Sequence, residues 1–192
     1  MKRLPHLQPT PIVAIKRALL TLPLLTCVAA HAASTSEATQ ADITPIISMY
    51  QGELACSKEL PATGGLVPVQ WRPKQVCPKG GEDEDEPFEA HSIRIRNMPI
   101  KSTVLLIDSN TCVKDGNAWI ELDTSRANAS LERMGVDKLW TYAGSAEKPG
   151  YVYNKGDDSN APSYGFRIIG KGNAIKPGEL ACVVISTPKR GH

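Results

Sequence analysis

The chain has 192 residues, carries a formal net charge of +2 and is 41% hydrophobic. This length suits a single domain with a sizeable buried core. The positive charge belongs to residues 1–32, because without their four basic side chains the rest of the chain has 18 basic against 20 acidic residues. We therefore expect no clustered basic face of the kind that binds nucleic acid or anionic membranes.

Residues 1–32 have the pattern of a secretory signal peptide. A basic segment precedes the apolar run 18–30, which is too short to span a bilayer, and residues 30–32 form a small-x-small cleavage sequence. Acylation of Cys27 would instead give a lipoprotein, but Thr26 directly before it fits that processing poorly. We predict an exported protein, periplasmic or secreted, without integral membrane insertion.

Four cysteines remain after the predicted signal peptide: Cys56, Cys77, Cys112 and Cys182. An even number in an exported chain indicates two disulfides, and three pairings are open. We favour Cys56–Cys77, which closes a Pro- and Gly-rich segment, and hence Cys112–Cys182. A metal site is not expected, because no two cysteines have C-x-x-C spacing and only His91 and His192 remain as imidazole ligands. We also predict no cofactor.

The first part of the exported chain alternates strand and loop patterns. Residues 33–41 lack periodicity and are predicted to be a flexible leader. The apolar residues of 43–56 predict one or two strands. Residues 57–79 are rich in proline and glycine and indicate a loop. Within that loop, residues 66–71 predict a short edge strand, since Pro68 excludes a central position in a sheet.

An acidic run and two strands are predicted in the middle of the chain. Residues 82–86 are all acidic, and we interpret them as a solvated loop rather than a cation site. Within the next segment, 91–96, isoleucine alternates with arginine at positions 93–96, which is typical of a half-buried strand. Residues 103–107 are apolar almost throughout and predict a strand that is covered on both faces.

A hairpin and one short helix are predicted next. The turn residues Asp115 and Gly116 favour a hairpin between 111–114 and 118–122. Apolar residues at helical spacing within 125–134 predict the one short helix.

The last predicted strands, 164–169 and 180–186, complete the fold class. We predict a single all-β domain over residues 42–187, an antiparallel two-sheet sandwich or barrel-like domain with one short helix and two disulfides, followed by a flexible tail at 188–192. The pentapeptide Gly-Glu-Leu-Ala-Cys occurs twice. Similar turn-into-strand environments select similar sequences, so we do not infer a duplication.

Residues for catalysis are few. A serine or cysteine nucleophile with a histidine base would have to use His91, and neither G-x-S-x-G nor S-x-x-K occurs. Paired carboxylates are recognised by geometry rather than by spacing, so four carboxylates at predicted strand ends stay candidates for a small hydrolase. These are Asp108, Asp115, Glu121 and Asp123.

An aromatic, glycine-rich region near the C-terminus supports a binding function. The candidate ligand-binding residues there are Trp140, Tyr142, Tyr151 and Tyr153. Such rings hold sugar or peptide faces, although they also close the ends of sandwiches. We predict an exported, non-enzymatic module that recognises a glycan, a peptide or an envelope protein. The alternatives are a secreted inhibitor or effector acting through a disulfide-fixed loop, such as 57–79 or the acidic run, and a small hydrolase.

Overall fold

The computed structural model describes residues 43–61, 67–79, 86–142, 149–153 and 161–188. The predictions for the signal peptide, for acylation of Cys27 and for the leader lie outside the described residues, as do those for most of the acidic run and of the tail. Within the described ranges, no helix is long and apolar enough to cross a membrane.

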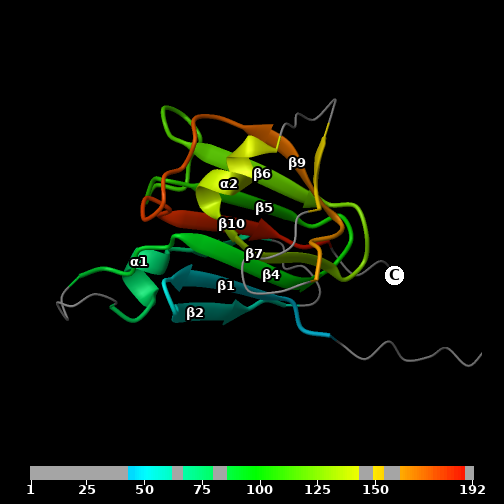
Figure 1. Ribbon diagram of the computed structural model, residues 1–192, viewed down its shortest axis with the longest axis horizontal. Helices are drawn as coiled ribbons and strands as arrows, with labels where there is room; N and C mark the ends of the chain where they lie inside the picture. The colour runs from blue at the N-terminus through cyan, green and yellow to red at the C-terminus, as the bar shows by residue number, and fades with distance from the viewer. Residues whose placement is uncertain (1–42, 62–66, 80–85, 143–148, 154–160, 189–192) are drawn as a thin grey trace, which may run out of the picture. The chain divides into compact units, whose positions relative to one another are not determined.

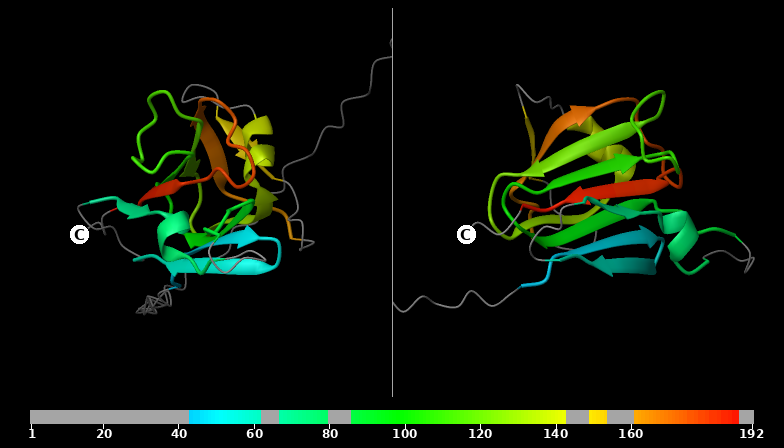
Figure 2. Two further views of the ribbon diagram at one scale, coloured as in Figure 1. Left: turned by 90° about the vertical axis from the view of Figure 1, so that its left-hand side faces the viewer. Right: turned by 180° about the vertical axis from the view of Figure 1, so that it is seen from behind.

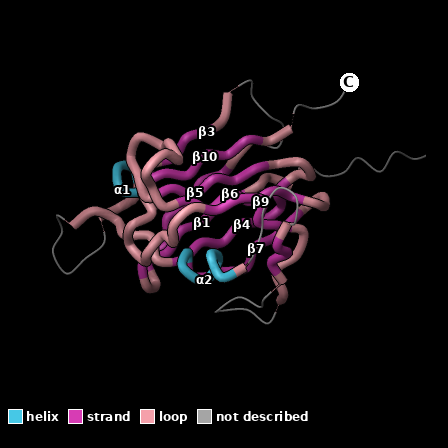
Figure 3. Tube along the Cα trace, turned by 90° about the horizontal axis from the view of Figure 1, so that it is seen from above, coloured by secondary structure: helices cyan, strands magenta, loops and turns pink. Residues whose placement is uncertain are grey.

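The described residues form two antiparallel sheets (Figure 1). The four-stranded sheet has the order β2-β1-β4-β7 and consists of β1 (Ile46–Gln51), β2 (Leu54–Glu59), β4 (Ser92–Met98) and β7 (Ala129–Gly135). The six-stranded sheet has the order β3-β10-β5-β6-β9-β8 and consists of β3 (Val69–Trp71), β5 (Thr103–Ile107), β6 (Trp119–Thr124), β8 (Gly150–Val152), β9 (Phe166–Lys171) and β10 (Cys182–Ser186). The predicted all-β sandwich class is confirmed, and β3 lies at a sheet edge as predicted (Figure 3).

The core lies between the two sheets and is built from alternate residues of their strands. Ile93 and Ile95 of β4, and Ile120 and Leu122 of β6, are completely buried. Side chains of a strand point alternately to its two faces, so these residues share one face and their polar neighbours share the other. Burying each such side chain stabilises the fold by about 1.5–3 kcal/mol relative to exposure.

Figure 2 shows the two sheets from two further sides. The contacts that link them differ between the two edges of the four-stranded sheet. At one side, the Cys56–Cys77 disulfide connects β2 to the end of α1 (Pro73–Val76). At the other side, the backbones of Ser130 and Tyr164 exchange two hydrogen bonds of 3.0 and 2.8 Å, which link β7 to the residues before β9. The second helix, α2 (Val136–Thr141), follows β7 and buries Val136 and Leu139 in the core.

The predicted helix at 125–134 is wrong, because most of that segment belongs to β7. Leu131 pairs with Ile95, and Met134 pairs with Ile93. The two partners are three residues apart on β7 but only two apart on β4, so β7 contains a bulge. A bulge of this kind places apolar residues three apart on one face of a strand, which imitates helical spacing. The described residues form two short helices instead of one, and neither begins within 125–134.

The predicted hairpin also differs from the structure. β5 pairs directly with β6, and residues 108–118 connect them, so 111–114 forms no strand. Gly116 does adopt the expected positive φ, +72°. The strand 103–107 was predicted to be covered on both faces, but the two faces differ in burial. Val104, Leu106 and Ile107 are fully buried, whereas Leu105 is only half-buried.

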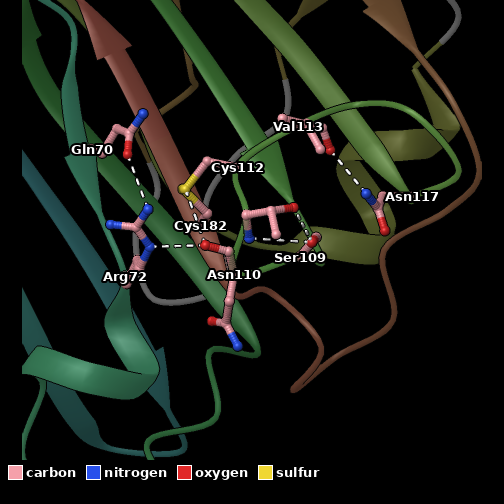
Figure 4. The surroundings of a disulfide bond; sticks show 9 residues. Gln70, Arg72, Ser109, Asn110, Cys112, Val113, Asn117 and Cys182 are labelled. Atoms are coloured by element: carbon pink, nitrogen blue, oxygen red, sulfur yellow. Dashed lines mark hydrogen bonds between the residues drawn. A yellow bond between two sulfur atoms is a disulfide. The ribbon is translucent and has the colours of Figure 1, made fainter.

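Both favoured disulfides are present, and Cys112–Cys182 fixes the 108–118 connection against the six-stranded sheet (Figure 4). Cys182 pairs with Ile107 across β10 and β5, so the disulfide lies beside this buried isoleucine. Arg72, just after β3, donates from Nε to the Asn110 carbonyl at 2.9 Å and from Nη2 to Gln70 at 3.1 Å. Two intrachain disulfides fit the oxidising environment of an exported protein.

The repeated pentapeptide has a local explanation. Gly52 and Gly178 begin the two copies, and both have positive φ, +56° and +85°. Each copy leads from a turn to a disulfide cysteine in a strand, one in β2 and the other in β10. Glycine adopts this conformation without the steric cost that other residues bear.

Replacing both cysteines of one disulfide by alanine should reveal their unequal contributions. In the chain-entropy model, losing Cys112–Cys182, which joins residues 70 apart, lowers the free energy of unfolding by about 4 kcal/mol. Losing Cys56–Cys77, with a separation of 21, lowers it by about 3 kcal/mol. Urea unfolding of the two double variants measures both values, and a larger loss for Cys56–Cys77 would contradict this order.

Two glycines with positive φ provide a matched test of packing. A Cβ at Gly165 would lie 2.9 Å from the Ala129 Cβ, whereas one at Gly116 would meet nothing within 4 Å. Gly116→Ala should therefore cost only backbone strain, about 1 kcal/mol. Gly165→Ala should cost about 2–4 kcal/mol, because overpacking adds to that strain. Thermal and urea unfolding compare the variants, and equal losses would show that the Ala129 contact is unimportant.

Candidate ligand-binding surface

Tyr151 and Tyr153 are exposed on the edge strand β8 and just beyond it. Val152 between them is 2% exposed and points into the core, whereas Tyr151 is 56% exposed and Tyr153 is 70% exposed. Period-two alternation along an extended chain explains why both rings face away from the core. These two rings are therefore the part of the predicted aromatic site that is accessible to a ligand.

Trp140 and Tyr142 have a different position. Both are partly buried and pack against the core. The Trp140 indole donates to the Gly172 carbonyl at 2.8 Å, and the ammonium of Lys171 lies 4.2 Å from the centre of its ring. Tyr142 meets Tyr153 edge-on, with the ring centres 5.9 Å apart. The structure thus brings Tyr142 and Tyr153 together, with Tyr142 as support for the exposed ring.

Arg167 and Asp123 lie beside Tyr151 on the outer face of the six-stranded sheet. The three residues form one row, because Asp123 of β6 pairs with Arg167 of β9, which pairs with Tyr151 of β8. Arg167 binds Asp123 through two nitrogens, with Nε 2.8 Å from Oδ1 and Nη2 in contact with Oδ2. Hydrogen bonding to Asp123 raises the pKa of Arg167, against burial, and the Tyr151 hydroxyl adds to this effect.

A second group of similar composition lies next to this row. Lys114 binds Glu121 at 2.7 Å, and its ammonium lies 4.3 Å from the centre of the Trp119 ring. The indole lies against β9, where a Cβ on Gly170 or Gly172 would come within 3.1 or 2.5 Å of it. Glycine at these two positions is thus what allows the indole to approach the backbone so closely.

Sequence reasoning did not assign a binding role to Arg167 or Trp119, and it treated Asp123 only as a possible catalytic carboxylate. One signal was present: Trp119, Glu121 and Asp123 alternate with buried residues along β6 and therefore share the outer face. Their cationic partners come from other segments, which the pattern of β6 does not indicate.

Three of the four candidate carboxylates are held apart, each by a different partner. Glu121 and Asp123 each bind a different cation, and Asp108 accepts a hydrogen bond of 3.0 Å from the Ala118 amide. Asp115 is exposed in the turn. His91 is on the surface, with Nε2 3.7 Å from Glu89 Oε2. No three His, Cys, Asp or Glu side chains gather as a possible metal site among the described residues.

The alternative hypothesis of a disulfide-fixed loop has its own surface. Val67 and Val76, on either side of β3, are 77% and 64% exposed. Val67 also lines a small apolar groove together with Leu60, Pro61, Pro68, Val69, Ile185, Ser186 and Thr187.

Comparison of the chain with known protein families, curated proteins and solved structures finds no match.

The four aromatic residues should separate into two classes by their effect on stability. Trp140→Ala and Tyr142→Ala should lower the free energy of unfolding by about 2–4 kcal/mol, because both rings pack against the core. Tyr151→Ala and Tyr153→Ala should change it by no more than about 0.5 kcal/mol, since these rings are largely in water. Urea unfolding followed by circular dichroism measures all four. A large loss for Tyr151→Ala would show that this ring serves packing.

Proposed function

We propose that the protein is an exported glycan-binding module. Its binding site would be the surface formed by Tyr151, Tyr153, Arg167 and Asp123, called here the Tyr151 surface. The observation that carries the proposal is the exposed Tyr151 ring beside the two-pronged Arg167–Asp123 pair. The module would act in the periplasm or outside the cell, after removal of the predicted signal peptide.

Sugars require both kinds of contact that the Tyr151 surface offers. The apolar face of a pyranose ring stacks on an aromatic ring, and Tyr151 supplies such area at a low cost in conformational entropy. Hydroxyl groups around the sugar need donors and acceptors in fixed directions. Arg167 and Asp123 fix one another and still keep further N–H groups and lone pairs for a ligand. This preorganisation reduces the entropy lost on binding.

The charges favour a sugar without ionic groups. Beside Tyr151, Arg167 is matched by Asp123, and the neighbouring Lys114 is matched by Glu121. An acidic ligand would have to compete with these carboxylates for the cations. A neutral sugar can hydrogen-bond to both members of a pair without separating them, and the proposal is therefore a neutral glycan.

A glycan array probed with the oxidised protein tests this function. Tyr151→Ala should weaken binding to the best neutral glycan by at least about tenfold, because the stacking area is lost. Tyr151→Phe is the matched control and should keep most of the affinity, since it retains the ring. Val76→Ala, which alters an exposed residue away from β8, should have no effect.

Two results would contradict the proposal. One is an array on which the wild-type protein binds no glycan, or binds only acidic ones. The other is a glycan whose affinity stays the same after Tyr151→Ala while the circular dichroism spectrum is unchanged.

A second candidate function is that of a secreted inhibitor or effector that contacts another protein through residues 57–79. The exposure of Val67, and of Val76 directly before Cys77 of the Cys56–Cys77 disulfide, favours it. Val67→Ser and Val76→Ser would then weaken capture of a protein from envelope extract, and Tyr151→Ala would not. The reverse result supports the Tyr151 surface.

A further inference from the structure

A hollow of about 400 Å³ lies on the outer face of the four-stranded sheet, the sheet that does not carry the Tyr151 surface. Its floor and walls come from three neighbouring strands: Ile46, Ser48 and Tyr50 of β1, Ser57 and Glu59 of β2, and Arg94 and Arg96 of β4. This volume is within the range of sites for small molecules.

The strand register places opposite charges at the two ends of one row. Glu59 pairs with Ile46 across β2 and β1, and Ile46 pairs with Arg96 across β1 and β4. Because neighbouring strands lie about 4.8 Å apart, the backbones of Glu59 and Arg96 are about 10 Å apart, with Ile46 between them. Both side chains are exposed, and neither has an ion-pair partner among the residues that the structure describes.

The next row is polar and firmly held. Ser57 and Ser48 share a hydrogen bond of 2.7 Å between their hydroxyls. On the other side of Ser48, Arg94 donates from Nη2 to Glu132 at 2.7 Å, and the Glu132 side chain is only 8% exposed. A buried carboxylate thus fixes the Arg94 guanidinium at the wall of the hollow and matches its charge.

The third row closes the hollow with an aromatic ring. The guanidinium of Arg133 lies 4.4 Å from the centre of the Tyr50 ring, within the range of a cation–π interaction. Arg133 also donates to the hydroxyl of Ser92 at 3.2 Å and to the carbonyl of Gly52. These contacts fix Tyr50, and together with Ile46 it gives the floor an apolar character.

The hollow is therefore polarised but carries little net charge. Arg94 is matched by Glu132, which leaves Arg96 on one wall and Glu59 on the other. A simple anion would meet Glu59, and a simple cation would meet Arg96. A ligand with both charges, separated by an apolar or amide portion, satisfies both walls at once.

We infer that this hollow binds a short peptide with free termini, its carboxylate directed to Arg96 and its ammonium to Glu59. An extended dipeptide spans about 7 Å, and the two charged side chains reach over the remaining distance. Arginine suits the carboxylate because its guanidinium can donate two parallel hydrogen bonds. Ile46 lies under the middle of the ligand, and the hydroxyls of Ser48 and Ser57 face its amide.

Four probes test the charge requirement by NMR titration of the ¹⁵N-labelled, oxidised protein. Alanyl-alanine should shift the amide resonances of Ile46, Ser48 and Tyr50 and saturate. N-acetyl-alanyl-alanine lacks the ammonium, and alanyl-alanine amide lacks the carboxylate, so each should bind at least about tenfold more weakly. Acetate alone should bind more weakly than the dipeptide.

Variants connect each wall to one end of the ligand. Arg96→Gln should weaken the binding of alanyl-alanine by about tenfold. It should leave the affinity of alanyl-alanine amide unchanged, because that probe has no carboxylate to lose. Glu59→Gln should also weaken alanyl-alanine by about tenfold, but it should leave the affinity of N-acetyl-alanyl-alanine unchanged, because that probe has no ammonium to lose. Arg126→Gln and Glu89→Gln are the matched controls. They remove the same kinds of charge outside the hollow and should leave the affinity of all four probes unchanged.

Several results would overturn the inference. One is the absence of shifts at Ile46, Ser48 and Tyr50 with alanyl-alanine. Another is equal binding of the dipeptide and its two blocked forms, or equal binding of acetate, which would identify a simple anion site. Because the blocked probes act on the wild-type protein, the test does not depend on the folding of a variant.

Discussion

The alternation of buried and exposed side chains along β4 and β6 is the constraint on which the rest of the structure depends. Ile93 and Ile95, with Ile120 and Leu122, have no exposed surface, because they lie between the two sheets. Once these residues face inward, the residues between them must face outward. A shift of one residue in either strand would bury arginine or carboxylate side chains, at a cost that the core could not offset. The core thus determines both candidate surfaces, one on the outer face of each sheet.

Local sequence patterns were sufficient to predict much of this fold. They did not predict which distant residues pair with one another. The alternation in β4 and the edge position of β3 follow from residues close in sequence. The number of cysteines indicated two disulfides but left three pairings open, of which the favoured one is present. The strand β7 could not be recognised, because its bulge spaces Leu131 and Met134 like residues of a helix. The Arg167–Asp123 pair could not be predicted either, since the two residues are 44 positions apart and meet only through the register of β6 and β9.

The aromatic residues show the same limit at the level of a site. Period-two spacing of Tyr151 and Tyr153 correctly indicates that both rings share one side of an extended strand. The same spacing of Trp140 and Tyr142 is misleading, because α2 ends at Thr141 and both side chains pack against the core. Composition identifies where aromatic residues are frequent, and only the arrangement of layers decides which of them reach solvent.

The two outer faces differ in how their charges are arranged, and this difference decides which ligands suit them. On the six-stranded sheet, Asp123 and Arg167 occupy adjacent strands and neutralise each other, so the pair offers oriented hydrogen-bonding groups without net charge. On the four-stranded sheet, Ile46 on the middle strand separates Glu59 from Arg96. No ion pair joins Glu59 to Arg96 among the described residues, so these charges remain available to a ligand that bridges them. Strand register therefore produces a neutralised pair on one sheet and two separated charges on the other.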